Sequence, residues 1–510
     1  MGLFAIRRRS QAQTDERPLS RGTLVGLGAM IGVLGLLVHT NVEVPPLAIL
    51  SVGTIGVLAL LASGLRRPDL PLYVMVAYLP FSKLLTGDFG GIMTALNLTN
   101  LLLVVLVVSW FASASTEGAP RFEPNALHVP IFLYAGWGLG TFLWKSICST
   151  TGWYFSYHLA DMKRWLDPFV LYVLYFHMVK DKRRWKAVVI LIMIGVTVAA
   201  AMAVHDYMGV REGTSLNKSR VEGIAGQPNI LGAFFVYYMF LFAAFWIQRI
   251  RQPASWWLLV PFGLCFRGIM VTFSRGAYLA FAQGLLGFTY FKNKALFLLA
   301  VGLMGFALLN PWMLPEGIRY RLESTFKDDT RLTDAYDVSN PEAHLDKSSS
   351  TRIFIWRGAM RMIQEEPWTG IGLGRFSENI IDFAPELGGK GIDAHNAYVI
   401  TAAEFGLPAL VFFLWVIAAL FRVTSQVYRR HPDAFIRATA HGFLGGLSGL
   451  LLANMFGSRL NTSEVSGYFW ILAALMARAR LWTKAEAATR QAAAPARHRL
   501  LRSARVRTAS

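Results

Sequence analysis

The sequence predicts an all-α polytopic membrane protein with about 12–14 transmembrane helices and one large periplasmic loop, and three observations lead to this fold class. First, 54% of the 510 residues are hydrophobic and only 16% are charged, which is more apolar surface than a soluble fold can bury. Second, the mean hydropathy of +0.41 is concentrated in long uncharged stretches. Third, one polar excursion, residues 314–395, interrupts these stretches.

Fourteen apolar stretches are long enough to cross roughly 30 Å of hydrocarbon at about 1.5 Å per residue. They cover residues 22–38, 46–64, 69–87, 92–113, 127–147, 165–179, 186–206, 229–248, 255–273, 276–292, 295–313, 396–421, 435–456 and 464–481. The stretch at 69–87 is weak because it contains two prolines and a lysine, and the stretch at 165–179 is short. A true number of about twelve is therefore also compatible with the sequence.

Basic residues in the short connections predict the orientation. Every second connection except the one around Arg121 is rich in Lys and Arg, as in Arg66-Arg67, Lys180 to Lys186, Arg249 and Arg251, and Arg429-Arg430. Cytoplasmic loops carry this excess, so we expect both termini in the cytoplasm and the protein in a bacterial inner membrane. The net charge of +19 is then a topology signal, and we expect membrane lipids and no nucleic acid as partners.

This topology divides the chain into five parts: a cytoplasmic N-terminal segment at 1–21, transmembrane helices over 22–313, the large periplasmic loop at 314–395, C-terminal transmembrane helices over 396–481, and a basic cytoplasmic tail at 482–510. We interpret the first apolar run as uncleaved, because no small-residue cleavage site follows it. The tail is rich in Ala and Arg, and we expect it to be disordered or to lie at the interface.

The excess of basic residues in cytoplasmic loops does not explain the basic residues on the predicted outer side. Arg275 lies between two apolar runs with only Ser274 and Gly276 around it, and its planar fork suits phosphate oxygens. Arg220 begins a Gly-rich connection that ends in Pro228 and Asn229, and Asn229 could cap the next span. Ion pairing or snorkelling would explain a single arginine, whereas several basic residues on the predicted outer side indicate that an anion binds there.

The large loop changes character along its length. Residues 316–347 carry many acids without tight ligand spacing, so a solvated stretch is favoured over a divalent-cation site and no metal is expected. Ser350 or Thr351 could cap a helix whose apolar face includes Ile355, Met360 and Ile363. Arg352 belongs to this helix. The loop then ends in Gly370-Ile371-Gly372-Leu373-Gly374-Arg375, whose backbone amides could approach a phosphate.

His395 stands where the loop meets the next apolar run, two residues after Asp393 and directly before Asn396. A neutral imidazole can accept a proton from a hydroxyl nucleophile, and Asp393 or a nearby carbonyl could fix its tautomer. A structural histidine at a helix start is the alternative. The position at the membrane surface, with arginines on the same side, favours catalysis.

These motifs together resemble the bacterial O-antigen ligase and O-antigen polymerase superfamily. The resemblance rests on Arg220 with Gln227-Pro228-Asn229, Ser274-Arg275-Gly276, the 370–374 glycines, and His395-Asn396-Ala397-Tyr398 followed by Glu404-Phe405-Gly406-Leu407-Pro408. It implies a metal-independent inverting glycosyltransferase without a cofactor, whose donor is a glycan on undecaprenyl diphosphate. It also implies Arg220 and Arg275 as diphosphate ligands and His395 as general base or orienting group for the acceptor. Arg352, Arg375 and Asn396 are further substrate-binding candidates, and the first two have no clear match in the family.

The acceptor stays open at this stage. Ligation of O-antigen to the lipid A core in lipopolysaccharide assembly is favoured, with polymerisation of O-antigen or exopolysaccharide and transfer to protein hydroxyls as alternatives. A transporter of a lipid-linked substrate is the alternative from another class. It would place ionisable residues at mid-bilayer depth, whereas here the charges gather at the ends of the apolar runs.

Overall fold

The computed structural model describes residues 56, 59–64, 67–85, 98–117, 122–149, 153–210, 220–314, 318–319, 347–388, 391–458, 460 and 463–507. Within these ranges the regular secondary structure is helical throughout, which confirms the all-α fold. The N-terminal segment 1–21, the predicted span at 22–38, most of the span at 46–64 and most of the acidic stretch at 316–347 lie outside the described residues.

The first half of the described chain supplies the helices α3 (Asp69–Tyr78), α4 (Ser82–Leu85), α5 (Leu98–Glu117), α6 (His128–Cys148), α7 (Trp153–Met178), α8 (Lys182–Met208), α10 (Pro228–Gln248), α11 (Leu259–Val271), α12 (Arg275–Lys292) and α13 (Lys294–Leu309). Short 3₁₀ turns η1 (Leu79–Phe81), η3 (Gly223–Ala225), η4 (Pro253–Leu258) and η5 (Pro311–Met313) join some of them. The second half supplies α15 (Lys347–Glu365), α16 (Phe376–Phe383), η8 (Pro385–Leu387), α17 (Ala397–Phe405), α18 (Leu407–Arg430), α19 (Ala434–Ala453) and α20 (Ser463–Arg507).

Five of the described segments are long and apolar enough to cross a membrane: α8, α10, η4 with α11, α18 and α19. Shorter apolar helices lie at 69–81, 98–112 and 294–309. On α13, Leu298, Leu303 and Leu309 are 66%, 59% and 83% exposed, and a hydrocarbon environment is where such side chains are stable. The chain is therefore a multi-pass membrane protein.

Close contact between α10 and α19 organises the centre of the bundle. Gly442 and Gly446 stand one turn apart on α19, and a Cβ at Gly446 would lie 2.0 Å from the carbonyl oxygen of Tyr237. Small residues at this spacing let two membrane helices approach backbone to backbone. This contact fixes the end of α19, which reaches the candidate site described below.

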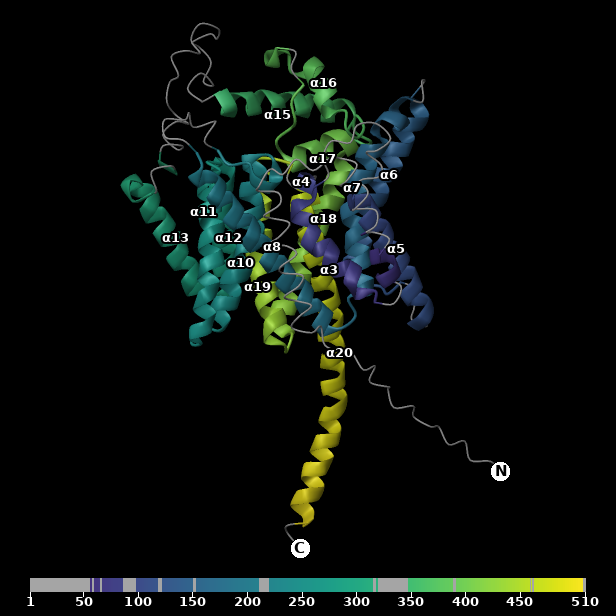
Figure 1. The fold of residues 1–510 in the computed structure, drawn as a ribbon, viewed down its shortest axis with the longest axis vertical. Helices are drawn as coiled ribbons and strands as arrows, with labels where there is room; N and C mark the ends of the chain where they lie inside the picture. Colours follow the sequence, from purple (N-terminus) through teal and green to yellow (C-terminus); the bar gives the residue numbers. More distant parts are fainter. Residues whose placement is uncertain are drawn as a thin grey trace, which may run out of the picture.

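The structure corrects three of the predicted segments. The helix expected at 165–179 is α7, which starts at Trp153 and is therefore twelve residues longer at its N-terminal end. The span expected at 396–421 is two helices, α17 and α18, separated at Gly406 with a φ of 83°. The tail, expected to be disordered or to lie at the interface, is not disordered: it continues α20 as a helix to Arg507, and Figure 1 shows this helix extending beyond the bundle.

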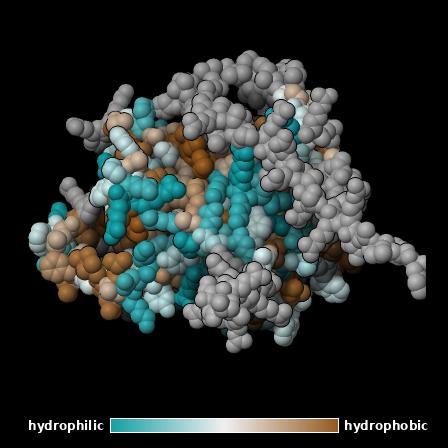
Figure 2. Space-filling view, turned by 90° about the horizontal axis from the view of Figure 1, so that it is seen from below, coloured by the Kyte–Doolittle hydropathy of each residue, from teal (hydrophilic) through white to brown (hydrophobic). Residues whose placement is uncertain are grey.

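The two ends of the bundle differ in composition. Lys182 pairs with Glu486 at 2.6 Å and Lys186 pairs with Asp433 at 2.7 Å, which ties the start of α8 to α20 and to the start of α19. Figure 1 shows α20 leaving the bundle at its lower end. Figure 2 views this lower end and shows hydrophilic residues gathered over its middle. The basic residues that predict the cytoplasmic side therefore share one end of the described structure.

The upper end carries a small subdomain with its own core. Figure 1 shows α15 and α16 lying across the top of the bundle, above α17. Buried apolar side chains from α15, α16, α17 and the connections between them form this core, among them Ile355, Phe376, Ile380 and Ala402. The predicted amphipathic face of α15 is confirmed except at Met360, which is 55% exposed, while Met362 is buried. The helix also begins earlier than predicted, at Lys347.

Candidate active site

Arg220 is fastened to the turn between α11 and α12. Its Nε donates a hydrogen bond to the carbonyl oxygen of Thr272 at 2.9 Å, and a terminal nitrogen donates to Asn229 Oδ1 at 2.7 Å. The backbone N–H of Val221 donates to the carbonyl oxygen of Val271 at 3.2 Å. The predicted capping role of Asn229 is wrong, because α10 begins at Pro228 and the amide oxygen of Asn229 serves Arg220 instead.

Arg275 occupies the first position of α12, three residues after the carbonyl that holds Arg220. Ser274 caps this helix, its Oγ accepting from the N–H of Ala277 at 3.3 Å, and Arg275 is half-buried. The N-terminus of a helix carries partial positive charge and attracts anions, so it reinforces the guanidinium. The structure thus brings the two predicted phosphate ligands, Arg220 and Arg275, to one turn.

Lys83 adds a third cation that the sequence gives no reason to place there. Its Nζ donates to the carbonyl oxygen of Ala225 at 3.1 Å, across 142 residues of sequence. It also lies against Gly226, where an added Cβ would be 2.4 Å from Nζ. The lysine appears in the sequence only as an interruption of a weak apolar run. Its position near the outer end of that run is the one local signal that could have singled it out.

His395 lies at the start of α17 with an unusual backbone conformation. Its φ is 47°, a left-handed value that costs a residue with a side chain about 1–2 kcal/mol. Asp393 Oδ2 accepts a hydrogen bond from the N–H of His395 at 3.0 Å and lies 3.4 Å from its Nδ1. A carboxylate beside Nδ1 favours the tautomer protonated there, which leaves Nε2 able to accept a proton. The imidazole is 32% exposed and therefore accessible.

Backbone strain marks both halves of the site. Among the described residues, the two non-glycine residues with positive φ are Phe273, two residues before Arg275, and His395 itself. Strained residues cluster at functional sites, because the surrounding contacts must hold them against relaxation. This observation supports a functional role for the α11–α12 turn and for the loop before α17.

The residues after α19 connect these two halves. The N–H of Ala397, at the start of α17, donates to the carbonyl oxygen of Asn454 at 2.8 Å. On the other side, a Cβ at Gly276 would lie 2.9 Å from Cβ of Phe456, so the start of α12 is packed against this short segment. The start of α17 and the start of α12 therefore both contact residues 454–456. This segment links the helix that follows His395 to the helix that begins with Arg275.

The remaining predicted residues have different positions. Asn396 caps α17, its Oδ1 accepting from the N–H groups of Tyr398 at 3.0 Å and Val399 at 3.1 Å, as its place in the sequence indicates. Arg352 lies one turn before Trp356 on α15, and Trp356 Nε1 donates to the carbonyl oxygen of Ala394 at 3.0 Å. Arg352 therefore lies one helical turn away from Trp356, the residue of α15 that contacts the loop of His395.

Arg375 stands apart from the turn that carries Arg275. It precedes α16, and its guanidinium donates to the carbonyl oxygen of Ile371 at 3.4 Å. The neighbouring Gly374 lies against α7, where an added Cβ would be 2.6 Å from His158 Nδ1. The structure therefore places Arg375 on the α7 side of the subdomain.

The glycine motif is a structural element. Gly370, Gly372 and Gly374 have φ values of 66°, 107° and 77°. The N–H groups of Ile371 and Gly372 donate to carbonyl oxygens at the end of α17, at 2.8 and 3.1 Å. These amides are thereby engaged by the protein and do not face a phosphate, which corrects the expectation from the sequence.

Glu404 holds the same loop and was missed by the sequence reasoning. Its Oε1 accepts hydrogen bonds from the N–H groups of Gly374 at 3.0 Å and Phe376 at 3.4 Å. The side chain is buried in α17, a nine-residue helix too short to cross a membrane. Burial raises the pKa of Glu404 to about 8, against the lowering effect of the two hydrogen bonds. Glu404 therefore joins the loop of Arg375 to α17, the helix that follows His395.

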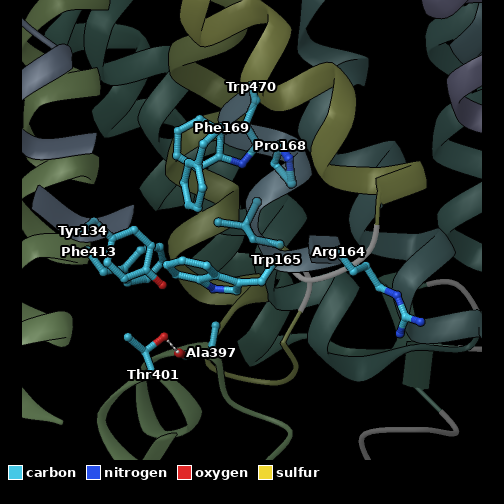
Figure 3. A pocket seen from close by; sticks show the side chains of 10 residues that line it. Tyr134, Arg164, Trp165, Pro168, Phe169, Ala397, Thr401, Phe413 and Trp470 are labelled. Carbon is cyan, nitrogen blue, oxygen red and sulfur yellow. Dashed lines mark hydrogen bonds between the residues drawn. The ribbon is translucent and has the colours of Figure 1, made fainter. Parts of the chain in front are cut away.

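A narrow cavity lies beside the start of α17. Figure 3 shows aromatic rings of Tyr134, Trp165 and Trp470 around it, with Arg164 pointing away from the rings. Ala397, two residues after His395, is part of the wall, and Thr401 Oγ1 donates to its carbonyl oxygen at 2.7 Å. The free volume of about 30 Å³ holds one or two waters and no sugar ring.

Metal ligands are not grouped in the described part of the chain: it contains no cluster of three or more His, Cys, Asp or Glu residues that could hold an ion. Cys148 is exposed and Cys265 is buried, and both are free thiols. The acidic stretch considered for a divalent cation lies largely outside the described residues.

Comparison with known proteins adds an independent line of support. No curated protein matches the chain. Residues 260–414 match the family model described as O-antigen ligase, a region that runs from α11 into α18 and contains Arg275 and His395. This match covers about a third of the chain and supports the resemblance to the O-antigen ligase and O-antigen polymerase superfamily.

Proposed function

We propose that this protein is a membrane glycosyltransferase of the inner membrane, which moves a glycan from undecaprenyl diphosphate to a hydroxyl of the lipid A core at the periplasmic face. In this proposal it acts as an O-antigen ligase in lipopolysaccharide assembly. The family match supports the reaction class in general. The observation that carries the specific proposal is the turn that unites Arg220 and Arg275 beside the loop of His395.

The two arginines suit a diphosphate leaving group. Arg220 is already oriented by Thr272 and Asn229, so little reorganisation is needed when an anion arrives. Arg275 contributes a second guanidinium at a helix N-terminus. Together they would stabilise the negative charge that develops on the diphosphate as its bond to the sugar breaks. Lys83, which holds the carbonyl of Ala225 in the Arg220 connection, would position this half of the site.

His395 would serve the acceptor. In a single displacement, the acceptor oxygen forms a bond to the anomeric carbon from the face opposite the diphosphate, and the bond to the diphosphate oxygen breaks. The hydroxyl proton passes to Nε2 of His395, whose tautomer Asp393 favours. This single step inverts the anomeric configuration. The guanidinium groups supply the positive charge, so the proposed reaction needs no metal ion or cofactor.

The upper subdomain would complete the acceptor side. Arg352 belongs to the helix whose Trp356 holds the carbonyl of Ala394, and Asn396 fixes the start of α17. We propose that residues 314–395 form the periplasmic loop and that both termini are cytoplasmic, since Lys182 and Lys186, from a connection rich in basic residues, lie at the opposite end of the bundle.

The acceptor decides between ligase, polymerase and protein O-oligosaccharyltransferase. Purified protein is incubated with an undecaprenyl diphosphate glycan and, in separate reactions, with lipid A core, no added acceptor, or a Ser/Thr peptide. We expect the glycan on lipid A core. Longer lipid-linked glycans without an acceptor would identify a polymerase, glycopeptide would identify a protein transferase, and unchanged donor in every reaction would contradict glycosyl transfer and favour a transporter.

A further inference from the structure

An apolar groove opens at the lower end of the bundle, far from the candidate active site. It lies between α8, α10, the η4–α11 segment and the start of α19, and its volume is about 420 Å³. Half-buried side chains of α8 from Ile190 to Val198 form one wall, and Phe242 and Phe435 contribute to the others. Eight residues of helix correspond to about 12 Å, close to the hydrocarbon depth of one leaflet.

The groove has a cation at one end. Arg249 lines it directly after the end of α10, is exposed, and makes no ion pair with any residue that the structure describes. The other lining residues are apolar except Thr197. The nearby Lys186 is already paired with Asp433 at 2.7 Å. Arg249 is therefore the charge in this wall that is open to a ligand.

Neighbouring aromatic residues set the depth of this cation. Trp256 and Trp257 follow Arg249 in η4 and are 51% and 76% exposed. Exposed tryptophans of membrane proteins concentrate at the headgroup level, where the ring is partly apolar and partly wet. Arg249 therefore stands at headgroup level, and the groove extends from it into the hydrocarbon region.

We propose that this groove binds one acyl chain of an anionic phospholipid, with the phosphate headgroup on Arg249. An apolar channel of one-leaflet depth with a guanidinium at its mouth matches an anionic lipid in charge as well as in length. A zwitterionic lipid fills the channel equally well, but it carries a compensating cation in its headgroup. The site is independent of the proposed glycosyl transfer.

Native mass spectrometry of the full-length protein tests this site. The protein is titrated with phosphatidylglycerol or with phosphatidylcholine of the same acyl chains. We expect phosphatidylglycerol to bind about fivefold more tightly, the scale of one basic residue near a lipid surface. Arg249→Gln should abolish the preference, whereas Arg251→Gln, a neighbouring exposed arginine outside the groove, should keep it.

A second variant separates the groove from general surface charge. Ile194→Trp fills the channel and should lower the occupancy of both lipids, while thermal unfolding reports whether the variant folds. Equal binding of the two lipids by the wild-type protein would overturn the proposal. A preference that survives Arg249→Gln, or that falls equally in Arg251→Gln, would overturn it as well.

Discussion

Replacement of Glu404 tests how the loop of the glycine motif is held to α17. The carboxyl group is buried, it accepts two backbone hydrogen bonds, and burial raises its pKa from 4.5 to about 8. Between pH 4.5 and about pH 8, the Glu404 carboxyl is protonated in the folded protein and ionised in the unfolded chain. The resulting stability is fully present below about pH 4.5 and is lost as the pH rises through about 8.

The magnitude follows from the difference between the two pKa values. A difference of 3.5 corresponds to about 5 kcal/mol over the whole window. Between about pH 6 and pH 9 the wild-type protein should lose about 3 kcal/mol of unfolding free energy through this group. Glu404→Gln keeps an oxygen acceptor and cannot ionise, so it should remove this pH dependence. Glu404→Ala leaves two buried N–H donors without an acceptor, which costs about 1–3 kcal/mol for each.

Thermal unfolding of the purified protein in detergent at pH 6 and pH 9 measures these effects. We expect Glu404→Gln to resemble the wild-type protein at pH 6 and to be more stable than it at pH 9. Glu404→Ala should be less stable than Glu404→Gln at both pH values. If the wild-type protein and Glu404→Gln show the same change between the two pH values, the assignment of this proton to Glu404 is refuted.

The other predictions concern the proposed reaction. Arg220→Lys and Arg275→Lys should each lower turnover by at least about tenfold. An ammonium group cannot reproduce the hydrogen bonds of the planar guanidinium group, which are worth about 1.5–3 kcal/mol each. Wild-type turnover in both variants would argue against bidentate binding. Asn396→Ala should lower the unfolding free energy by about 1 kcal/mol and slow transfer, whereas Asn396→Asp keeps the cap and should retain stability. Lys83→Gln should raise KM for the lipid-linked donor more than it lowers kcat, because Lys83 contacts the Arg220 connection and not the histidine; equal loss in kcat alone would contradict this role.

Local patterns in the sequence predict much of the fold and part of the site. Apolar periodicity predicts most described helices, and the junction of loop and membrane singles out His395. The break at Gly406 was missed because α17 and α18 are both apolar, although glycine followed closely by Pro408 is a helix-ending pattern. The extension of α7 to Trp153 was missed because charged residues at Asp161, Lys163 and Arg164 interrupt its apolar pattern.

Contacts between distant segments could not be predicted. Lys83 meets the Arg220 connection across 142 residues, and Ala397 meets Asn454 through backbone atoms that carry no side-chain signature. Glu404 lies in an apolar run, and only the folded loop shows which amide groups it serves. These interactions depend on how the helices pack, and helix packing is not encoded in any single stretch of sequence.

Loss of His395 tests the proposed active site most directly. His395→Ala is compared with the wild-type protein for transfer of glycan from undecaprenyl diphosphate to lipid A core, with binding of the donor measured separately. The account predicts that transfer is abolished while donor binding persists, because Arg220 and Arg275 hold the diphosphate and His395 accepts the hydroxyl proton. Transfer at the wild-type rate would contradict the proposed mechanism.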